Sequence, residues 1–395
     1  MKKKLIVLFP QKFTQFEYFK FEIEKYKKLK YKVDIIDLSK ILLSKSFNKA
    51  WKSIRSKYAI APNSILELYF CLKRNKENSI ILSFLANNYT LKICIIFFII
   101  QILKIKQIFI NDTHPSTKWR SKNIIYWFIL KLKQHKFNFR VYFFYLQYLV
   151  SKFLMIFLQN PKVFFSNLKL KNIKKIKLIN FYDYSSSLEK SKIEKPYKSY
   201  CLYLDNGGPY FFGDAGLIGA KHPTYDIKKI YADIIFFFKK IESDFNCKVI
   251  IIPHPKYKSS QVNYSLNPYF RNFKVDNRPD ALVILTKNAK FLLARGSTAN
   301  SYAVIYKKPI INFYSFDFIY NFGDQADILD IIDKSKSLGK TAFNINNYSK
   351  KLFKEQLKVS LSSYKRYLFT ELTHKNTFNK PNYKIISEYI EKARL

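Results

Sequence analysis

The sequence predicts an α/β protein with two doubly wound parallel-sheet domains in tandem. In both halves of the chain, short apolar runs typical of buried strands alternate with longer amphipathic segments typical of helices. The 395 residues are enough for two domains of ordinary size, and 48% of them are hydrophobic, so each half has material for a core. A polar stretch that contains a proline, residues 185–198, is the expected boundary between the halves.

The first half begins with a buried strand expected at Lys4–Phe9. Its further strands are expected at Lys32–Leu38, Ser79–Phe84 and Gln107–Asn111, and its helices at Phe16–Leu29, Thr90–Lys104, Trp119–Lys133 and Tyr142–Leu158. These elements predict a first domain over residues 1–184, followed by the linker over residues 185–198.

The second half restarts the same alternation with a strand expected at Tyr200–Leu204. Its further strands are expected at Lys248–Ile252, Lys290–Ala294 and Pro309–Phe313, and its helices at Asp226–Ser243, Asp280–Asn288 and Ser297–Tyr306. A second domain is therefore expected over residues 199–346. The terminal helices, residues 347–395, are expected at Tyr348–Phe369 and Tyr383–Ala393.

The chain is strongly basic, with 70 Lys and Arg residues against 28 Asp and Glu residues and a net charge of +42. Part of this excess is compositional, because the chain is rich in Lys, Ile, Asn, Phe and Tyr together. Between Glu77 and Asp183 the only acidic residue is Asp112, and the same stretch is the most apolar part of the chain. Basic and apolar character together favours an anionic membrane surface over a nucleic-acid groove, which needs polar readout or exposed stacking platforms.

Two apolar stretches, Ile93–Leu103 and Val141–Leu158, lie in this basic region. The first has about half the length of a membrane span, and the second is borderline in length. Both are expected to be helices, either packed in the core or lying at a membrane interface, and a membrane-crossing helix is the less favoured alternative. The apolar run of Met1–Pro10 is too short for the core of a signal peptide, so it is expected to be the first strand.

The four cysteines, Cys71, Cys94, Cys201 and Cys247, are scattered along the chain without a close pair. This spacing disfavours a disulfide framework or a zinc site and favours small buried side chains in a reducing compartment. Together with the basic apolar stretch, it predicts a cytoplasmic protein bound peripherally to the inner face of the cytoplasmic membrane.

The first loop with candidate site residues directly follows the strand Tyr200–Leu204. It begins with Asp205, Asn206, Gly207 and Gly208, and residues 204–214 hold three of the eight glycines of the chain. Clustered glycines after a strand let a ligand approach the backbone closely, and Asp205 would act as a base or hold a ribose hydroxyl. The alternative is an ordinary Asp-Asn-Gly turn.

The second loop places His254 between two prolines at the end of the strand Lys248–Ile252. The prolines, of which Pro255 is the second, restrict the backbone and hold the imidazole in one direction. An imidazole at a strand end can donate a hydrogen bond to a phosphate oxygen and so assist a leaving group, and Lys256 adds positive charge. The alternative is a histidine that is packed in the core.

The third loop contains Arg295, Gly296, Ser297, Thr298 and Asn300. Gly296 would turn the chain after a strand, and the two hydroxyls would cap the next helix. A helix start with exposed N–H groups and hydroxyls suits an anion. Arg295 would pair with a phosphate or, as the alternative, with a carboxylate of the protein. The alternative is a helix cap without a ligand. The three loops together predict a site for a nucleotide-activated sugar.

The first half contributes a second candidate base in the sequence Ile110-Asn-Asp-Thr-His-Pro115. Asp112 follows a strand, and either Asp112 or His114 would deprotonate an acceptor hydroxyl; His114 is also expected to help bind the acceptor. The alternative is that Asp112 caps the helix after Pro115.

Three short motifs of the second half resemble those of a known group of enzymes. They are similar to bacterial surface-carbohydrate biosynthesis proteins and to GT-B transferases of nonulosonic acids, which are sialic-acid-like and Kdo-like sugars. The motifs, within Tyr200 to Ser315, are Asp205-Asn206-Gly207, His254-Pro255 and Ser297-Thr298, followed by Ala303-Val304 and Lys308-Pro309-Ile310-Ile311. Asn206 stands where that group commonly has a second acid.

This resemblance implies a GT-B fold, in which two Rossmann-like domains face a central cleft. It implies a CMP-linked sugar donor, a surface glycan or lipid-linked glycan as acceptor, no metal ion and no resident cofactor. The enzyme alternative is a glycerophosphotransferase of the teichoic-acid type that uses CDP-glycerol. The non-enzyme alternative is a basic nucleic-acid-binding protein, but the sequence contains no zinc-finger, RNA-recognition or helix-turn-helix pattern, so no nucleic-acid partner is expected.

Overall fold

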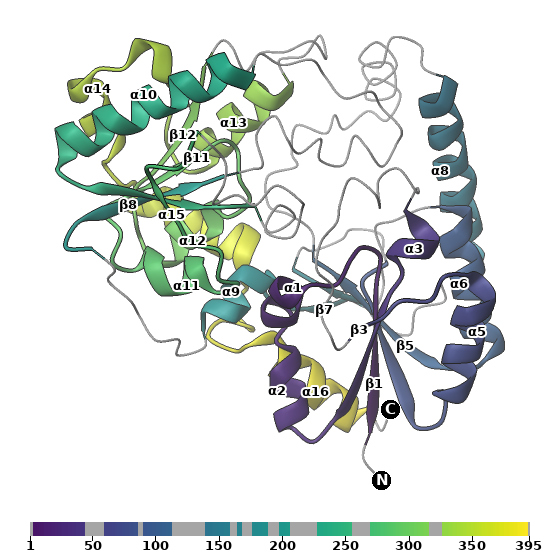
Figure 1. Ribbon diagram of the computed structural model, residues 1–395. Coiled ribbons are helices and arrows are strands. Elements are labelled where there is room, and N and C mark those ends of the chain that lie inside the picture. Colours follow the sequence, from purple (N-terminus) through teal and green to yellow (C-terminus); the bar gives the residue numbers. More distant parts are fainter. Residues whose placement is uncertain are drawn as a thin grey trace.

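The computed structural model describes residues 3–43, 59–85, 90–112, 139–158, 164–167, 176–188, 197–205, 227–254, 269–315 and 326–393. These residues form two parallel β-sheets, each with helices on both faces (Figure 1). The predicted fold class, two Rossmann-like α/β domains, is confirmed. No helix within these ranges combines the length and the apolar character that a membrane crossing requires.

The first sheet has seven parallel strands in the order β3-β2-β1-β4-β5-β6-β7. The strands are β1 Lys4–Phe9, β2 Lys32–Asp37, β3 Ala59–Ile60, β4 Ser79–Ser83, β5 Lys106–Asn111, β6 Phe164–Ser166 and β7 Ile176–Leu178. Leu5, Ile6, Val7 and Leu8 of β1 are all buried. A central parallel strand is covered on both faces, which is why its sequence is a continuous apolar run.

Helices cover both faces of this sheet. On one face lie α3 Ser39–Leu42, α5 Ile65–Arg74, α6 Leu91–Ile102 and α8 Phe139–Leu158. On the other lie α1 Gln15–Lys20, α2 Ile23–Lys28 and α16 Asn382–Lys392. The last helix of the chain thus returns to the first domain, where Ile386 and Ile390 are buried among residues of β1, β2 and β4. Figure 1 shows α16 beside α2, near the N-terminus.

One predicted helix, Phe16–Leu29, is divided into α1 and α2. The division is at Glu22, which has a left-handed φ of 57°. The buried Glu22 carboxylate accepts hydrogen bonds from the Ser185 hydroxyl at 2.8 Å and from the Tyr383 backbone N–H at 3.2 Å. These long-range contacts hold Glu22 in a conformation that a continuous helix would not allow.

The second sheet has six parallel strands in the order β10-β9-β8-β11-β12-β13. The strands are β8 Tyr200–Leu204, β9 Lys248–Ile252, β10 Lys274–Val275, β11 Leu292–Ala294, β12 Ile310–Tyr314 and β13 Phe343–Asn344. One face packs against α10 Ile227–Phe245, the 3-10 turn Ile345–Asn347 and α14 Lys350–Gln356. The other packs against α11 Ala281–Thr286, α12 Asn300–Ile305, α15 Leu361–Tyr367 and the π-helical turn Leu368–Leu372.

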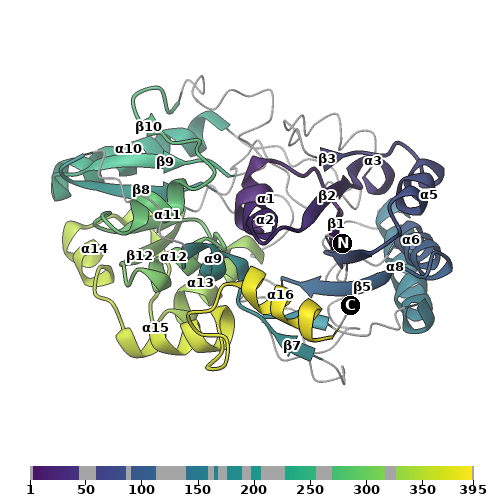
Figure 2. The same cartoon turned by 90° about the horizontal axis from the view of Figure 1, so that it is seen from below.

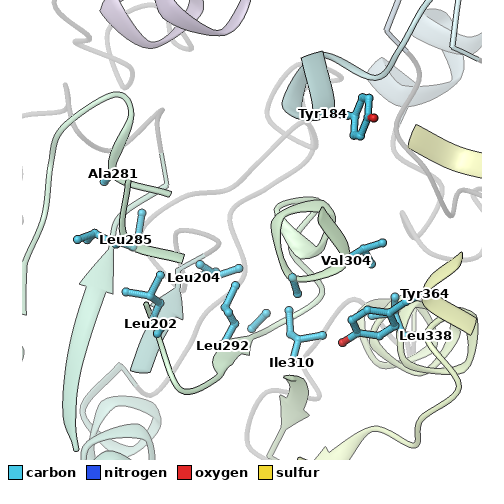
Figure 3. Packing of buried hydrophobic residues seen from close by; sticks show 14 of the residues in the cluster. Tyr184, Leu202, Leu204, Ala281, Leu285, Leu292, Val304, Ile310, Leu338 and Tyr364 are labelled. Carbon is cyan, nitrogen blue, oxygen red and sulfur yellow. The ribbon is translucent and has the colours of Figure 1, made fainter. Parts of the chain in front are cut away.

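Figure 3 shows the core beneath the second sheet, where strand residues meet helix residues. Leu202, Leu292 and Ile310 come from three adjacent strands, and Val304 of α12 and Tyr364 of α15 pack against them. The expected helix over residues 348–369 is two separate helices, α14 and α15, and the one expected from Ser297 begins at Asn300.

A short helix, α9 Tyr182–Ser187, lies between the domains and contacts both α1 and α12. The first residues of the expected linker, Ser185 and Ser186, are therefore buried in a packed helix rather than exposed. Residues 189–196 of that linker lie outside the described ranges.

Candidate functional site

The three predicted loops begin at neighbouring places on the carboxyl edge of the second sheet. Leu204, the last residue of β8, pairs with Ile252 of β9 on one side and with Ala294 of β11 on the other. The loops that begin with Asp205 and with Arg295, and the segment that carries His254, therefore leave the sheet from adjacent strands. The strand order reverses between β8 and β11, and parallel sheets bind ligands beyond the carboxyl ends of the strands at such a reversal.

Asp205 is fixed at this edge by its backbone and its side chain. Its N–H donates to the Ile252 carbonyl at 3.0 Å, and its carboxylate accepts a hydrogen bond from the Tyr203 hydroxyl at 3.0 Å. Burial raises the pKa of Tyr203 well above its usual range, the Asp205 charge raises it further, and the Arg295 charge opposes this shift. Asp205 and Arg295 thus act on the same hydroxyl, which remains a hydrogen-bond donor at neutral pH.

The loop after β11 turns at Gly296, which has a left-handed φ of 67°. The carbonyl of Gly296 accepts a hydrogen bond from the ammonium group of Lys334, a buried residue of α13 Ala326–Ser337. Sequence reasoning did not single out Lys334. The available signal was its position on the inward face of a helix, between the buried Ile331 and Leu338.

The residues after Gly296 form a turn before α12 begins. Ser297 and Thr298 are half-buried, and the Ser297 hydroxyl accepts a hydrogen bond from the backbone N–H of Ala299 at 3.2 Å. The buried Asn300 side chain donates to the Asn312 side chain of β12 at 3.1 Å. Asn300 therefore ties α12 to the sheet, and a role for it in donor binding stays a prediction.

His254 lies two residues beyond the end of β9 and is half-buried. Its role at a leaving group stays a prediction. The remaining site residues of the sequence analysis, which are Asn206, Gly207, Gly208, Pro255, Lys256 and His114, lie outside the described residues.

Asp112 belongs to an ionic network at the junction of the domains, in which Asp183 is buried and Lys20 and Asp112 are partly buried. Its carboxylate lies 3.1 Å from the ammonium nitrogen of Lys20 and accepts a hydrogen bond from the backbone N–H of Tyr182 at 3.3 Å. It therefore contacts the start of α9. Lys20 also lies 3.6 Å from Asp183, which accepts a hydrogen bond from the Ser301 hydroxyl of α12 at 2.8 Å. The network links the first domain, α9 and the second domain.

The protonation of this network follows from opposing effects. Burial acts to lower the pKa of Lys20, but the charges of Asp112 and Asp183 outweigh it and raise that pKa. Lys20 is therefore a cation at neutral pH. Burial raises the pKa of Asp183, and the neighbouring Asp112 charge adds to the shift, although Lys20 opposes it. Action of Asp112 as a base would have to proceed from this ion-paired state.

The first sheet also reverses its strand order, between β1 and β4, and aromatic rings lie at that point. Phe9 is the last residue of β1, and Phe84 comes directly after β4; both are half-buried. Their ring centroids are 5.9 Å apart, and the ring centroid of Phe21 lies 4.3 Å from that of Phe84. All three rings belong to or pack against the hydrophobic core of the first domain.

Replacing Gly296 with alanine is expected to lower the free energy of unfolding by about 1 kcal/mol, because a Cβ atom disfavours the left-handed region. Urea denaturation would measure the loss. Gly296→Asn is the matched comparison and should be less harmful, since asparagine adopts this region more readily. Equal stability of wild type and the alanine variant would contradict the strained turn.

No protein-family model and no curated protein sequence matches the chain. Its fold is similar to that of solved structures. The S. aureus MnaA–UDP co-structure matches with 10% identity and a TM-score of 0.53, covering 100% of this chain and 97% of that one. CalG4, the calicheamicin glycosyltransferase, matches with 8% identity and a TM-score of 0.49, covering 100% of this chain and 99% of that one. A putative UDP-N-acetylglucosamine 2-epimerase from Listeria monocytogenes matches with 10% identity and a TM-score of 0.48, covering 100% of this chain and 98% of that one. At such identities the likeness concerns the fold, and the chain has the GT-B type of architecture that the sequence predicted.

Proposed function

We propose that the protein is a glycosyltransferase that uses a nucleotide-activated sugar. The observation that supports this proposal is that Asp205, Arg295 and the segment leading to His254 follow three adjacent strands, at the point where the second sheet reverses its order. That edge offers a carboxylate, an imidazole and cationic groups within one region, which suits a phosphate-containing donor. The GT-B type of fold supports the same function.

In this proposal each group has one task. The positive charge of Arg295 and the hydroxyls of Ser297 and Thr298 hold the phosphate of the donor. The bond between the anomeric carbon and the phosphate oxygen breaks, and His254 stabilises the charge that develops on the departing nucleotide. An acceptor hydroxyl forms the new bond to the anomeric carbon and gives its proton to a carboxylate, for which Asp205 and Asp112 are the candidates.

The finer assignment is a CMP-linked nonulosonic acid as donor and a surface glycan or lipid-linked glycan as acceptor, at the inner face of the cytoplasmic membrane. Support for it comes from the Asp-Asn-Gly, His-Pro and Ser-Thr motifs and from the basic, apolar first half of the chain. The UDP in the S. aureus MnaA co-structure makes uridine nucleotides the main competitors in a test.

Thermal shift with free nucleotides tests the donor. CMP is expected to raise the melting temperature by a few degrees more than UMP, UDP, CDP, GDP or ADP do, because a ligand at a hundredfold its Kd stabilises by about 2.7 kcal/mol. Arg295→Met should abolish the shift, whereas Arg366→Met, an exposed residue on α15, should leave it unchanged. An equal response to all nucleotides would exclude the cytidine assignment, and no response to any would exclude the donor site.

A further inference from the structure

Large hydrophobic side chains are concentrated on the outside of two helices of the first domain. Of the eighteen that are exposed in the described part of the chain, ten lie on α6 and α8. Soluble monomers seldom gather so many apolar side chains in one place, and larger patches of this kind mark sites of contact with a protein or a membrane. The exposed surface of these two helices is called the α6–α8 face below.

The apolar side chains of α6 divide into two sets. Leu91, Ile95, Phe98 and Ile102 follow one another at steps of four, three and four residues, so they form one stripe, and each is 39% to 57% exposed. The opposite side of the helix, including Ile96 and Ile100, is buried against the first sheet. The sequence left a core helix and an interfacial helix as alternatives for this segment. In the structure one side of α6 is buried in the core and the other side is exposed.

Helix α8 extends the stripe. Its exposed apolar residues are Phe143, Leu146, Leu149, Val150, Phe153 and Leu154. The Cys94 thiol donates to the Ser151 carbonyl at 3.7 Å, and seven residues later in both helices the Gln101 amide donates to the Leu158 carbonyl at 2.5 Å. The helices are therefore parallel neighbours on the same side of the sheet, where Figures 1 and 2 show them along one side of the molecule.

The charge around this face restricts what can cover it. Lys92, Lys104 and Lys106 are exposed at the two ends of α6 and beyond it. The one acidic residue between Glu77 and Asp183 is Asp112, which is paired with Lys20 inside the domain junction. A second copy of the chain would bring the same positive charge against itself, whereas an anionic lipid surface complements it.

We propose that the α6–α8 face is the surface through which the protein docks on an anionic lipid membrane. The two apolar stripes enter the boundary between head groups and acyl chains, and the lysines at the ends of α6 meet the anionic head groups. This inference deepens the proposed function, since it names the surface that brings a transferase to a lipid-linked acceptor. Vesicle binding needs no donor, so the docking surface and the donor site can fail independently.

The test is co-sedimentation of the full chain with phosphatidylcholine vesicles, with and without phosphatidylglycerol. The wild type is expected to bind vesicles with phosphatidylglycerol and to bind them less well at high salt. Phe98→Gln and Phe153→Gln should each weaken binding by about tenfold, because each removes a half-exposed ring from the contact. Phe236→Gln, on α10 of the second domain, is the matched control and should bind as the wild type does, since its ring is as exposed as that of Phe153, at 62%.

All three rings are largely exposed, so the variants should melt at nearly the same temperature as the wild type. Measured melting temperatures therefore check that each variant is folded. Failure of the wild type to bind anionic vesicles would overturn the proposal, and so would equal binding by Phe98→Gln and the wild type. Light scattering tests whether a second copy of the chain covers the α6–α8 face instead. A dimer that Phe98→Gln dissociates would assign the face to a second copy of the chain and would also overturn the proposal.

Discussion

Replacing Lys20 with methionine is expected to lower the free energy of unfolding by about 3 to 5 kcal/mol, the range found when one partner of a buried ion pair is removed. The Lys20 side chain is 13% exposed, and its ammonium nitrogen lies 3.1 Å from Asp112 and 3.6 Å from Asp183. Without it, the buried Asp183 and the partly buried Asp112, whose side chain is 11% exposed, are left with no cation between them. Urea denaturation at neutral pH would measure the loss.

The variant should also show a diagnostic pH dependence. Loss of the cation raises the pKa of the buried Asp183 carboxyl further above its unfolded value, so the folded variant takes up a proton that the unfolded chain does not. Stability tied to such a proton is present at low pH and is lost as pH rises. The deficit of Lys20→Met relative to the wild type should therefore be larger near about pH 8 than near about pH 5.

Two further variants distinguish the effect of breaking this network from the effect of removing any lysine. Lys28→Met removes an exposed lysine from the end of α2 and should change stability by less than about 0.5 kcal/mol. Lys20→Met combined with Asp183→Asn removes the cation together with one carboxylate and should recover part of the loss. A deficit that is independent of pH and is not reduced in the double variant would contradict the network.

Replacing His254 with alanine is expected to lower the rate of sugar transfer by at least about tenfold to a hundredfold, because loss of one charge-stabilising donor typically costs about a hundredfold or more. The reason is the proposed role of the imidazole at the departing phosphate. Steady-state turnover with a CMP-linked donor would measure the change, with the melting temperature confirming that the fold is intact.

The conservative variant His254→Gln distinguishes the hydrogen bond from the charge. Glutamine keeps an N–H donor but carries no charge at any pH, so its rate should lie between those of the alanine variant and the wild type. If His254→Ala turned over at a nearly normal rate, His254 would have no part in the mechanism, and the edge of β9 would serve only to shape the site.

Several elements were predictable because local sequence is sufficient for them. The strands Lys4–Phe9, Tyr200–Leu204 and Lys248–Ile252 have in the structure the same ends as in the sequence prediction. Central strands of a parallel sheet are buried on both faces, so they need continuous apolar runs, and such runs are visible without knowledge of the partners. The same runs placed Asp205 and Arg295 directly after strands, and the observed register brings those two strands together.

The sequence by itself determined the α/β class, the two-domain order and the loops that follow the strands. Only the tertiary structure decided the break at Glu22, the pairing of Asp112 with Lys20 and the return of α16 to the first domain. It also decided which side of α6 is exposed. The physical reason is distance along the chain: Glu22 and Tyr383, for example, are 361 residues apart, so no local pattern of apolar or charged residues can encode their contact.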